Sequence, residues 1–148
     1  QYLADMRAKG ITIGSCNSVR ELCAECDTII TTTPSTEALV KSSWVRTGSH
    51  ITAIGADAEG KQELDTKLFG RAEGILVDSR EQCVDHAEAH YAVQAGIVKP
   101  KELVEIGEAL EGAPWRNNPA GDITIADLSG LGASDAILAQ AILSAVNK

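Results

Sequence analysis

The chain has 148 residues, which suits one domain, and 44% of them are hydrophobic, which is enough for a buried core. Aromatic residues make up only 3%, so the core must be built from Ile, Leu, Val and Ala. The formal net charge of -8 argues against nucleic acid or an anionic membrane as a partner, because either would repel the chain. We expect no signal peptide, and no apolar run of the sequence approaches the roughly 20 residues of a membrane span.

Short apolar segments typical of buried strands alternate along the chain with segments typical of helices. In chain order we expect a strand over 11–13, a helix over 18–26, a strand over 28–32, a short polar helix or turn over 36–42 and a strand over 50–54. A short helix over 65–69, a strand over 74–77, helices over 79–96 and 101–110, a strand over 123–125 and a helix over 134–146 follow. This alternation predicts an α/β fold, a parallel sheet with helices on its faces.

Three local features refine this prediction. Ser18 with Glu21 three residues later is typical of a capping box at a helix start. The β-branched run 28–32 is typical of a strand buried on both faces. Residues 1–9 are typical of the end of a helix, so we expect the sequence to be the later part of something longer, or a processed or truncated form.

Ligands of a parallel sheet bind beyond the carboxyl ends of its strands, which directs attention to 32–35, 55–61 and 78–80. Asp57 follows a buried strand, where a carboxylate can take a proton or stabilise a cationic amine or iminium. A solvated acidic loop is an equally good interpretation of Asp57. For Glu59, Glu63 and Asp65 it is the interpretation we favour. For 31–35, an ordinary strand-to-helix turn is favoured over a binding segment.

Two pairs of potential metal ligands are better explained without a metal. Cys23 and Cys26 form a lone CxxC motif, which two small apolar residues on the core side of a helix explain best. His86 and His90 lie four residues apart near Glu88 with no third ligand evident, so a solvated helix face is favoured. The four cysteines fit a reducing compartment, and we expect a cytoplasmic protein.

Four segments, taken in order, resemble the ornithine cyclodeaminase and mu-crystallin family. They are TTTPS after a strand, HITAIGAD..GKQELD, VDSREQ at the start of a helix, and DITIADLSGLGASDA near the C-terminus. The resemblance extends from about Asp27 to Val146. It implies an NAD(P)-dependent enzyme that transfers hydride between the cofactor and a carbon of a small amino or imino acid. It also implies a homodimer, and a Rossmann domain inserted into a separate substrate-binding and dimerisation domain.

The resemblance also assigns roles to individual residues. Asp57 matches the family's active-site aspartate, which favours a cyclodeaminase-like or dehydrogenase-like site. The cofactor is expected to pass Thr33 and Pro34 at its ribose, Ile54 and Gly55 near its nicotinamide, and a closing loop of Ser129, Gly130 and Leu131. By the same resemblance, residues 1–121 are a partial Rossmann domain that lacks the first strands. Residues 122–148 are its last strand and a helix that returns toward the second domain.

The sequence departs from the family pattern in one large respect. Family members carry a glycine-rich turn, a residue that reads the ribose, and Arg and Lys residues for the substrate carboxylate, and none of these is in the sequence. GLGAS at 130–134 lacks the third glycine of GxGxxG. Because the pyrophosphate then has no cradle of N–H groups, we expect this chain alone to bind NAD or NADP weakly or not at all and to be inactive.

Two functions follow as expectations. The first is the C-terminal portion of an NAD(P)-dependent cyclodeaminase-like enzyme, which performs cyclodeamination or imine reduction. The alternative is a truncated, free-standing binding or oligomerisation module without catalytic activity, which pairs through the sheet edge left bare by the missing strands.

Overall fold

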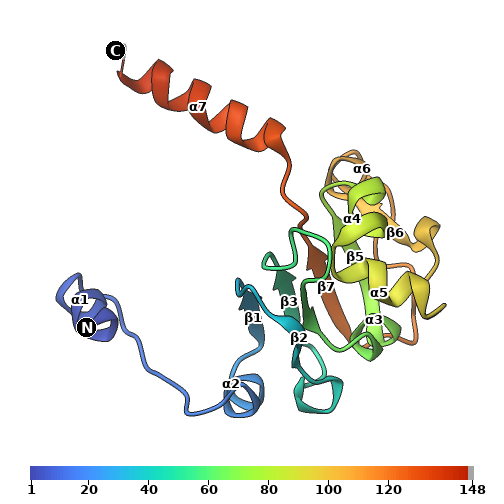
Figure 1. The fold of residues 1–148 in the computed structure, drawn as a ribbon, viewed down its shortest axis with the longest axis horizontal. Coiled ribbons are helices and arrows are strands. Elements are labelled where there is room, and N and C mark those ends of the chain that lie inside the picture. The colour runs from blue at the N-terminus through green and yellow to red at the C-terminus, as the bar shows by residue number, and fades with distance from the viewer. Residues whose placement is uncertain (147–148) are drawn as a thin grey trace.

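A parallel sheet runs through the centre of the structure, a computed structural model that describes residues 1–146 (Figure 1). The strands are β1 (Thr28–Thr31), β2 (Thr36–Val40), β3 (His50–Ala53), β4 (Gln62–Leu64), β5 (Ala72–Val77), β6 (Leu103–Glu105) and β7 (Ile123–Asp127). The helices are α1 (Tyr2–Ala8), α2 (Val19–Glu25), α3 (Lys67–Arg71), α4 (Arg80–His86), α5 (Glu88–Gln94), α6 (Ile106–Leu110) and α7 (Gly132–Val146). Two 3-10 turns are η1 (Ser42–Trp44) and η2 (Pro100–Glu102).

Five strands form the main sheet in the order β1-β3-β7-β5-β6, and β2 pairs with β4 in a separate two-stranded sheet. All the strand pairs are parallel, and β7, the last strand of the sequence, lies in the middle, where Ile125 pairs with Ile51 and Ile75. A parallel sheet flanked by helices confirms the predicted fold class. Because the strands are parallel, their carboxyl ends meet at one edge of the sheet.

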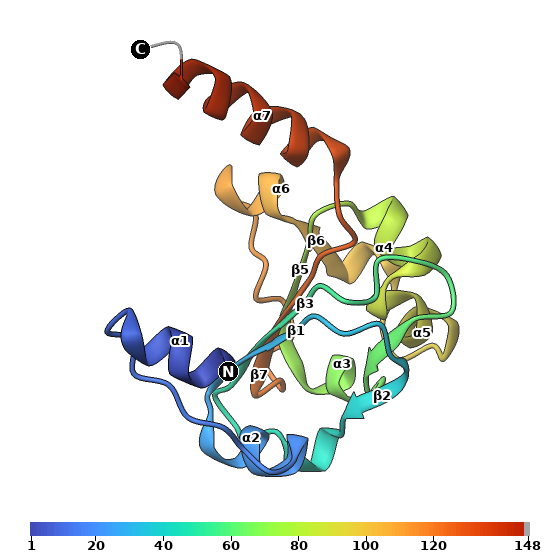
Figure 2. The same cartoon turned by 60° about the vertical axis from the view of Figure 1, so that its left-hand side comes forward.

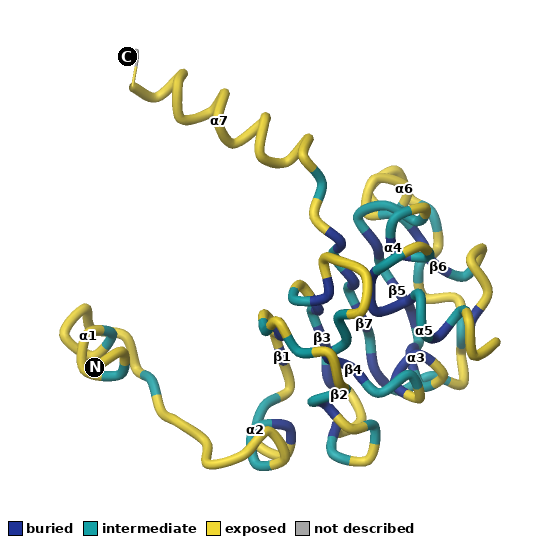
Figure 3. The backbone as a smooth tube through the Cα atoms, in the orientation of Figure 1, coloured by how far each residue is buried: buried dark blue, intermediate teal, exposed yellow. Residues whose placement is uncertain are grey.

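The core lies on one face of this sheet. Ile29, Ile51 and Ile125 are at most 2% exposed and pack in one cluster with buried residues of α2, α3, α4 and α5. Ile30, on the opposite face of β1, is 62% exposed, and the burial colours of Figure 3 alternate along this strand. The prediction that 28–32 is buried on both faces is therefore wrong, because the described elements cover only one side of β1.

The expected strand over 11–13 does not form. Residues 11–13 have no regular structure, and Figure 1 shows α1 lying apart from the sheet. Figure 2 shows the segment after α1 running to α2 at the bottom of the view. An isolated strand is unstable without a partner, and no described strand pairs with these residues. Ser18 caps α2 as predicted, since its Oγ accepts a hydrogen bond from the N–H of Glu21 at 3.1 Å. The predicted box is incomplete, because the carboxylate of Glu21 accepts from the N–H of Asn17 at 2.7 Å and not from that of Ser18.

Three other expected elements differ from the structure because tertiary contacts override local pattern. The expected helix or turn over 36–42 is mainly strand β2, which buries Val40 and pairs it with Leu64 of β4. The expected helix over 101–110 begins as strand β6, where Val104 pairs with Leu76. The expected helix over 79–96 breaks into α4 and α5 at Ala87, whose backbone is extended. No helix among residues 1–146 is long and apolar enough to cross a membrane.

Candidate functional site

The carboxyl ends of β3, β5 and β7 surround a cavity of about 640 Å³. Its lining includes Ile54 and Asp57 after β3, Asp78 after β5, and Leu128 to Gly132 after β7. Five of the predicted site residues therefore come together in one place. They are Ile54, Asp57, Ser129, Gly130 and Leu131.

Thr33 and Gly55, two further predicted cofactor residues, do not line this cavity but are joined beside it. The N–H groups of Thr33 and Gly55 donate to the two carboxylate oxygens of Glu63, at 2.5 Å and 3.0 Å. Pro34 follows Thr33 directly and is exposed. Glu63 itself is fully buried, so its interpretation as part of a solvated acidic loop is wrong. The alternation of β4 was too short to reveal in the sequence that Glu63 points inward.

The close approach of these segments depends on a glycine. A Cβ added to Gly55 would lie 2.3 Å from the carbonyl oxygen of Thr33 and 2.5 Å from the carboxyl group of Glu63. Neither distance is compatible with a side chain at this position. The small residue expected from the sequence is thus required by packing between β1, β3 and Glu63.

Asp57 lies at the rim of the cavity. Its carboxylate pairs with the ammonium of Lys61, and 55% of its side chain is exposed. The hydrogen bond from Lys61 lowers the pKa of Asp57 below its ordinary value, although burial acts in the opposite direction. Asp57 is consequently an anion at neutral pH, suited to stabilising a cationic amine or iminium more than to abstracting a proton.

Asp78 fixes the loop after β7. Its carboxylate accepts hydrogen bonds from the N–H and hydroxyl of Ser129 at 3.0 Å and 2.8 Å, and from the N–H of Gly130 at 2.8 Å. Burial opposes the charge of Asp78, but these donors and the N–H of Ser79 outweigh it and lower the pKa. The sequence directed attention to 78–80 by its position after a strand, but did not show that Asp78 shapes the loop.

Two more buried carboxyl groups lie behind the site. Glu88 is 1% exposed, and burial raises its pKa to about 8 although the N–H groups of Glu63 and Leu64 donate to it. Asp127 is also 1% exposed, and burial raises its pKa to about 7 although the N–H of Ala89 donates to it at 2.8 Å. The interpretation of Glu88 as part of a solvated helix face is therefore wrong.

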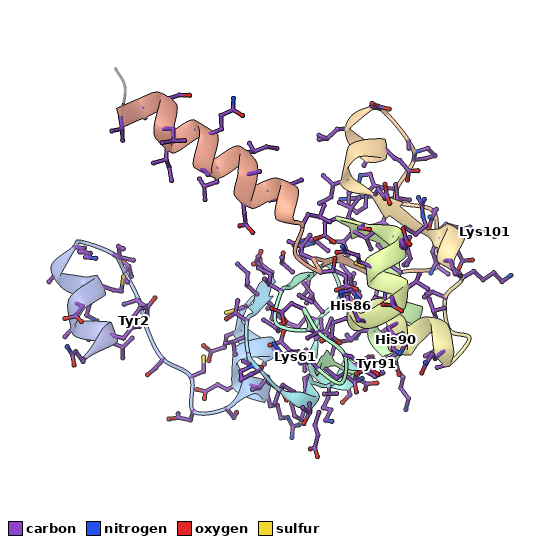
Figure 4. All side chains as sticks on the ribbon, turned by 45° about the horizontal axis from the view of Figure 1, so that its top comes forward. Tyr2, Lys61, His86, His90, Tyr91 and Lys101 are labelled. Atoms are coloured by element: carbon purple, nitrogen blue, oxygen red, sulfur yellow. The ribbon has the colours of Figure 1, made fainter. Side chains whose placement is uncertain are left out.

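The remaining candidate metal ligands are used in other ways. His86 ends α4 and His90 lies on α5 (Figure 4), where its Nδ1 donates to the carbonyl of Val84 at 2.8 Å. Cys23 is fully buried in the core, and Cys26 is half-buried at the end of α2. Within residues 1–146, no group of three or more His, Cys, Asp or Glu side chains is placed to hold a metal ion.

Comparison with known proteins agrees with this arrangement. Residues 1–148 match the family model of the ornithine cyclodeaminase/mu-crystallin family. The chain belongs to this family. The resemblance inferred from the four sequence segments is thereby confirmed.

Relatives in this family include several dehydrogenases and reductases. The chain is 39% identical over 123 residues to the alanine dehydrogenase of Archaeoglobus fulgidus, covering 82% of this chain and 38% of that protein. It is 37% identical over 121 residues to the iminosuccinate reductase of Paracoccus denitrificans, covering 81% and 37%. The chain thus spans less than two fifths of the length of these relatives.

Solved structures show the same fold. The iminosuccinate reductase of Paracoccus denitrificans in complex with NAD+ superposes with a TM-score of 0.85 at 34% identity, over 96% of this chain and 44% of that one. An archaeal alanine dehydrogenase dimer with bound NAD superposes with a TM-score of 0.80 at 36% identity, over 94% and 43%.

Proposed function

We propose that this chain forms the nicotinamide side of an NAD(P)-dependent site, as the C-terminal portion of a cyclodeaminase-like or imine-reducing enzyme. The observation that carries the proposal is the cavity at the strand ends, where Ile54, Asp57 and the loop after β7 meet. Two similar structures contain NAD, and both belong to proteins more than twice as long as this chain. The substrate would be a small amino or imino acid.

The chemistry of the cavity fits a nicotinamide ring. Ile54, Ile106, Leu128 and Leu131 offer apolar surface to a flat ring, and backbone groups of the loop after β7 offer polar contacts at the rim. The charged lining residues are all acidic: Asp57, Asp78 and Asp135. This charge suits a cationic ring or an iminium and repels a diphosphate.

The residues present can be given distinct tasks. When bound, the cofactor would supply or accept the hydride. Ile54 and Leu131 would exclude water from the reacting face, because water around a cationic imine weakens every electrostatic contact. Asp57, kept ionised by Lys61, would stabilise the positive charge of the substrate nitrogen. Asp78 would hold Ser129 and its loop in place.

Binding of the cofactor's pyrophosphate is not expected from this chain, because the sequence contains no GxGxxG turn. The sequence left weak binding or no binding of NAD and NADP as expectations for this chain alone, and the cavity at the strand ends favours weak binding. Titration calorimetry should detect no binding in the micromolar range with either nucleotide. Micromolar affinity would contradict this part of the proposal.

Saturation-transfer NMR with millimolar NAD tests which end of the nucleotide the chain contacts. Saturation should pass from the protein mainly to the nicotinamide protons, since the proposed contacts are with that ring. Strongest transfer to the adenine protons, or no transfer to either ring, would refute the proposal. Free adenosine and free nicotinamide are suitable control ligands in the same experiment.

A second candidate, a module that acts by association, is favoured by helix α7. This helix extends away from the sheet (Figure 1), and none of its described residues is buried. It exposes five large apolar side chains, between 54% and 77% each: Ile137, Leu138, Ile142, Leu143 and Val146. We propose that α7 packs against a substrate-binding or dimerisation domain, or against a second chain. Light scattering that shows a monomer at high concentration would count against association of this chain with itself.

A further inference from the structure

The strands β1 and β3 separate where the site begins. Their last shared hydrogen bond runs from the N–H of Ile54 to the carbonyl of Thr31, at 3.0 Å. Beyond it, the N–H groups of Thr33 and Gly55 both turn to the carboxylate of Glu63. The side chain of Glu63 thus takes the place of the next backbone hydrogen bond between the strands and bridges their two diverging ends.

Glu63 is held from behind by a second carboxyl group. The N–H groups of Glu63 and Leu64 donate to the two carboxyl oxygens of Glu88, the latter at 3.0 Å. Glu88 is the first residue of α5, so this contact ties strand β4 to the start of that helix. The backbone on which Glu63 stands is therefore fixed independently of its own side-chain contacts.

A third carboxyl group completes the series. Asp127 is the last residue of β7, and it accepts a hydrogen bond from the N–H of Ala89 at 2.8 Å. Ala87, the residue before α5, makes no side-chain cap, so Asp127 caps this helix from across the core. Asp127 comes just before the loop that contains Ser129. The three buried carboxyl groups Glu63, Glu88 and Asp127 therefore lie between two parts of the proposed nicotinamide site, the Thr33 and Gly55 segments and the loop after β7.

These three buried groups are an expensive way to stabilise a core. A buried carboxyl group costs free energy unless it is fully hydrogen-bonded, and apolar residues of similar size are often at least as stabilising. None of the ion pairs among residues 1–146 involves Glu63, Glu88 or Asp127. Their hydrogen-bond partners are backbone N–H groups instead. Each of these N–H groups lies at the end of a strand, or at the start of a helix, that borders the site.

We propose that Glu63 is a positioning residue that sets the separation of the Thr33 and Gly55 segments at the cofactor surface, and that Glu88 and Asp127 hold it in place. The bridge that Glu63 makes between the N–H groups of Thr33 and Gly55 is called the clamp below. Its positioning role rests on the proposed function, but the clamp itself does not. Glu63 touches neither the cavity nor a reacting atom in this arrangement, and it acts through the two backbone segments that it joins.

The replacement Glu63→Gln tests the clamp in the full chain. A glutamine offers one carbonyl oxygen and one NH₂ group, so one of the two N–H donors must lose its acceptor. The NMR amide proton shift of Thr33 or Gly55 should move upfield in E63Q, because bonds to a carboxylate are stronger than those to an amide. Glu59→Gln, at an exposed position of the loop before β4, is the matched control and should leave both shifts unchanged.

The effect on the cofactor is measured with the same samples. NAD titrated into E63Q should bind roughly tenfold more weakly than to the unaltered chain, because restoring the separation of the released Thr33 and Gly55 segments would take about 1.4 kcal/mol of the binding free energy. In E59Q the affinity should not change. Unchanged amide shifts in E63Q would overturn the clamp, and moved shifts with unchanged NAD affinity would overturn its positioning role.

Two further outcomes remain decisive. If E63Q does not fold, hydrogen exchange in the unaltered chain replaces it: slow exchange at both Thr33 and Gly55 supports the clamp, and rapid exchange at either one overturns it. If the unaltered chain shows no contact with NAD, the proposed function fails, and the amide shifts still decide whether Glu63 bridges the two segments.

Discussion

Replacement of Gly55 by alanine should strongly destabilise the chain, because the new methyl group has no room. It would lie 2.3 Å from the carbonyl oxygen of Thr33 and 2.5 Å from the carboxyl group of Glu63, whereas ordinary contacts begin at 3.4 Å. Overpacking of this kind costs about 1–3 kcal/mol. If Glu63 is displaced, a bond from a buried N–H to its carboxylate is lost as well, at about 1.5–3 kcal/mol.

The expected loss of about 2.5–6 kcal/mol, the sum of these two contributions, is a large share of the roughly 5–15 kcal/mol that stabilises a typical domain. Urea denaturation followed by circular dichroism measures it. Gly107→Ala is the matched control, because a Cβ at Gly107 meets no atom within 4 Å and the residue lies in α6. If G55A were within about 0.5 kcal/mol of the unaltered chain, the close packing of Gly55 against Glu63 would be refuted.

Three other predictions concern the acidic residues. The folded chain keeps a proton on Glu88 up to a pKa of about 8, against an ordinary value of 4.5, so the free energy of unfolding should fall as the pH rises through this range. Urea midpoints measure this fall, and it should be smaller in E88Q. An equal fall in E88Q would contradict the raised pKa of Glu88. Asp78→Asn should release the loop after β7, seen as faster hydrogen exchange at Ser129 and Gly130, and unchanged exchange would show that Asp78 does not fix it. Asp57→Asn should leave the thermal unfolding midpoint unchanged, since its ion pair with Lys61 is exposed, and a drop of several degrees would assign Asp57 a structural role.

The sequence predicted the family and the parallel sheet, and it directed attention to the strand ends beside which the cavity lies, because these features depend on local signals. Ser18 and Ser79 cap helices where the hydroxyl and spacing indicated. The rule that parallel strands end together directed attention to Asp57, and the family resemblance added Ile54 and Ser129. The cavity at the strand ends is lined by all three.

The remaining features depend on partners that are distant in the sequence. β2 and β4 are too short to show an alternation, and they exist because Val40 and Leu64 pair across 24 residues. Glu63 and Glu88 lie in segments that contain several other polar or charged residues, which suggested solvent. Their burial goes with N–H donors that only the fold brings near. A charged residue in a polar segment carries no local sign of such donors.

A titration of the isotopically labelled chain with NAD, followed by the NMR amide signals, tests the central claim most directly. The account predicts that the shifts change at Ile54 and over 129–131, around the cavity at the strand ends. Signals around a separate cavity of about 350 Å³ near Phe69 and Ile97 should stay in place. Changes confined to that second cavity, or no changes at millimolar NAD, would contradict the claim that these residues form the nicotinamide side of a cofactor site.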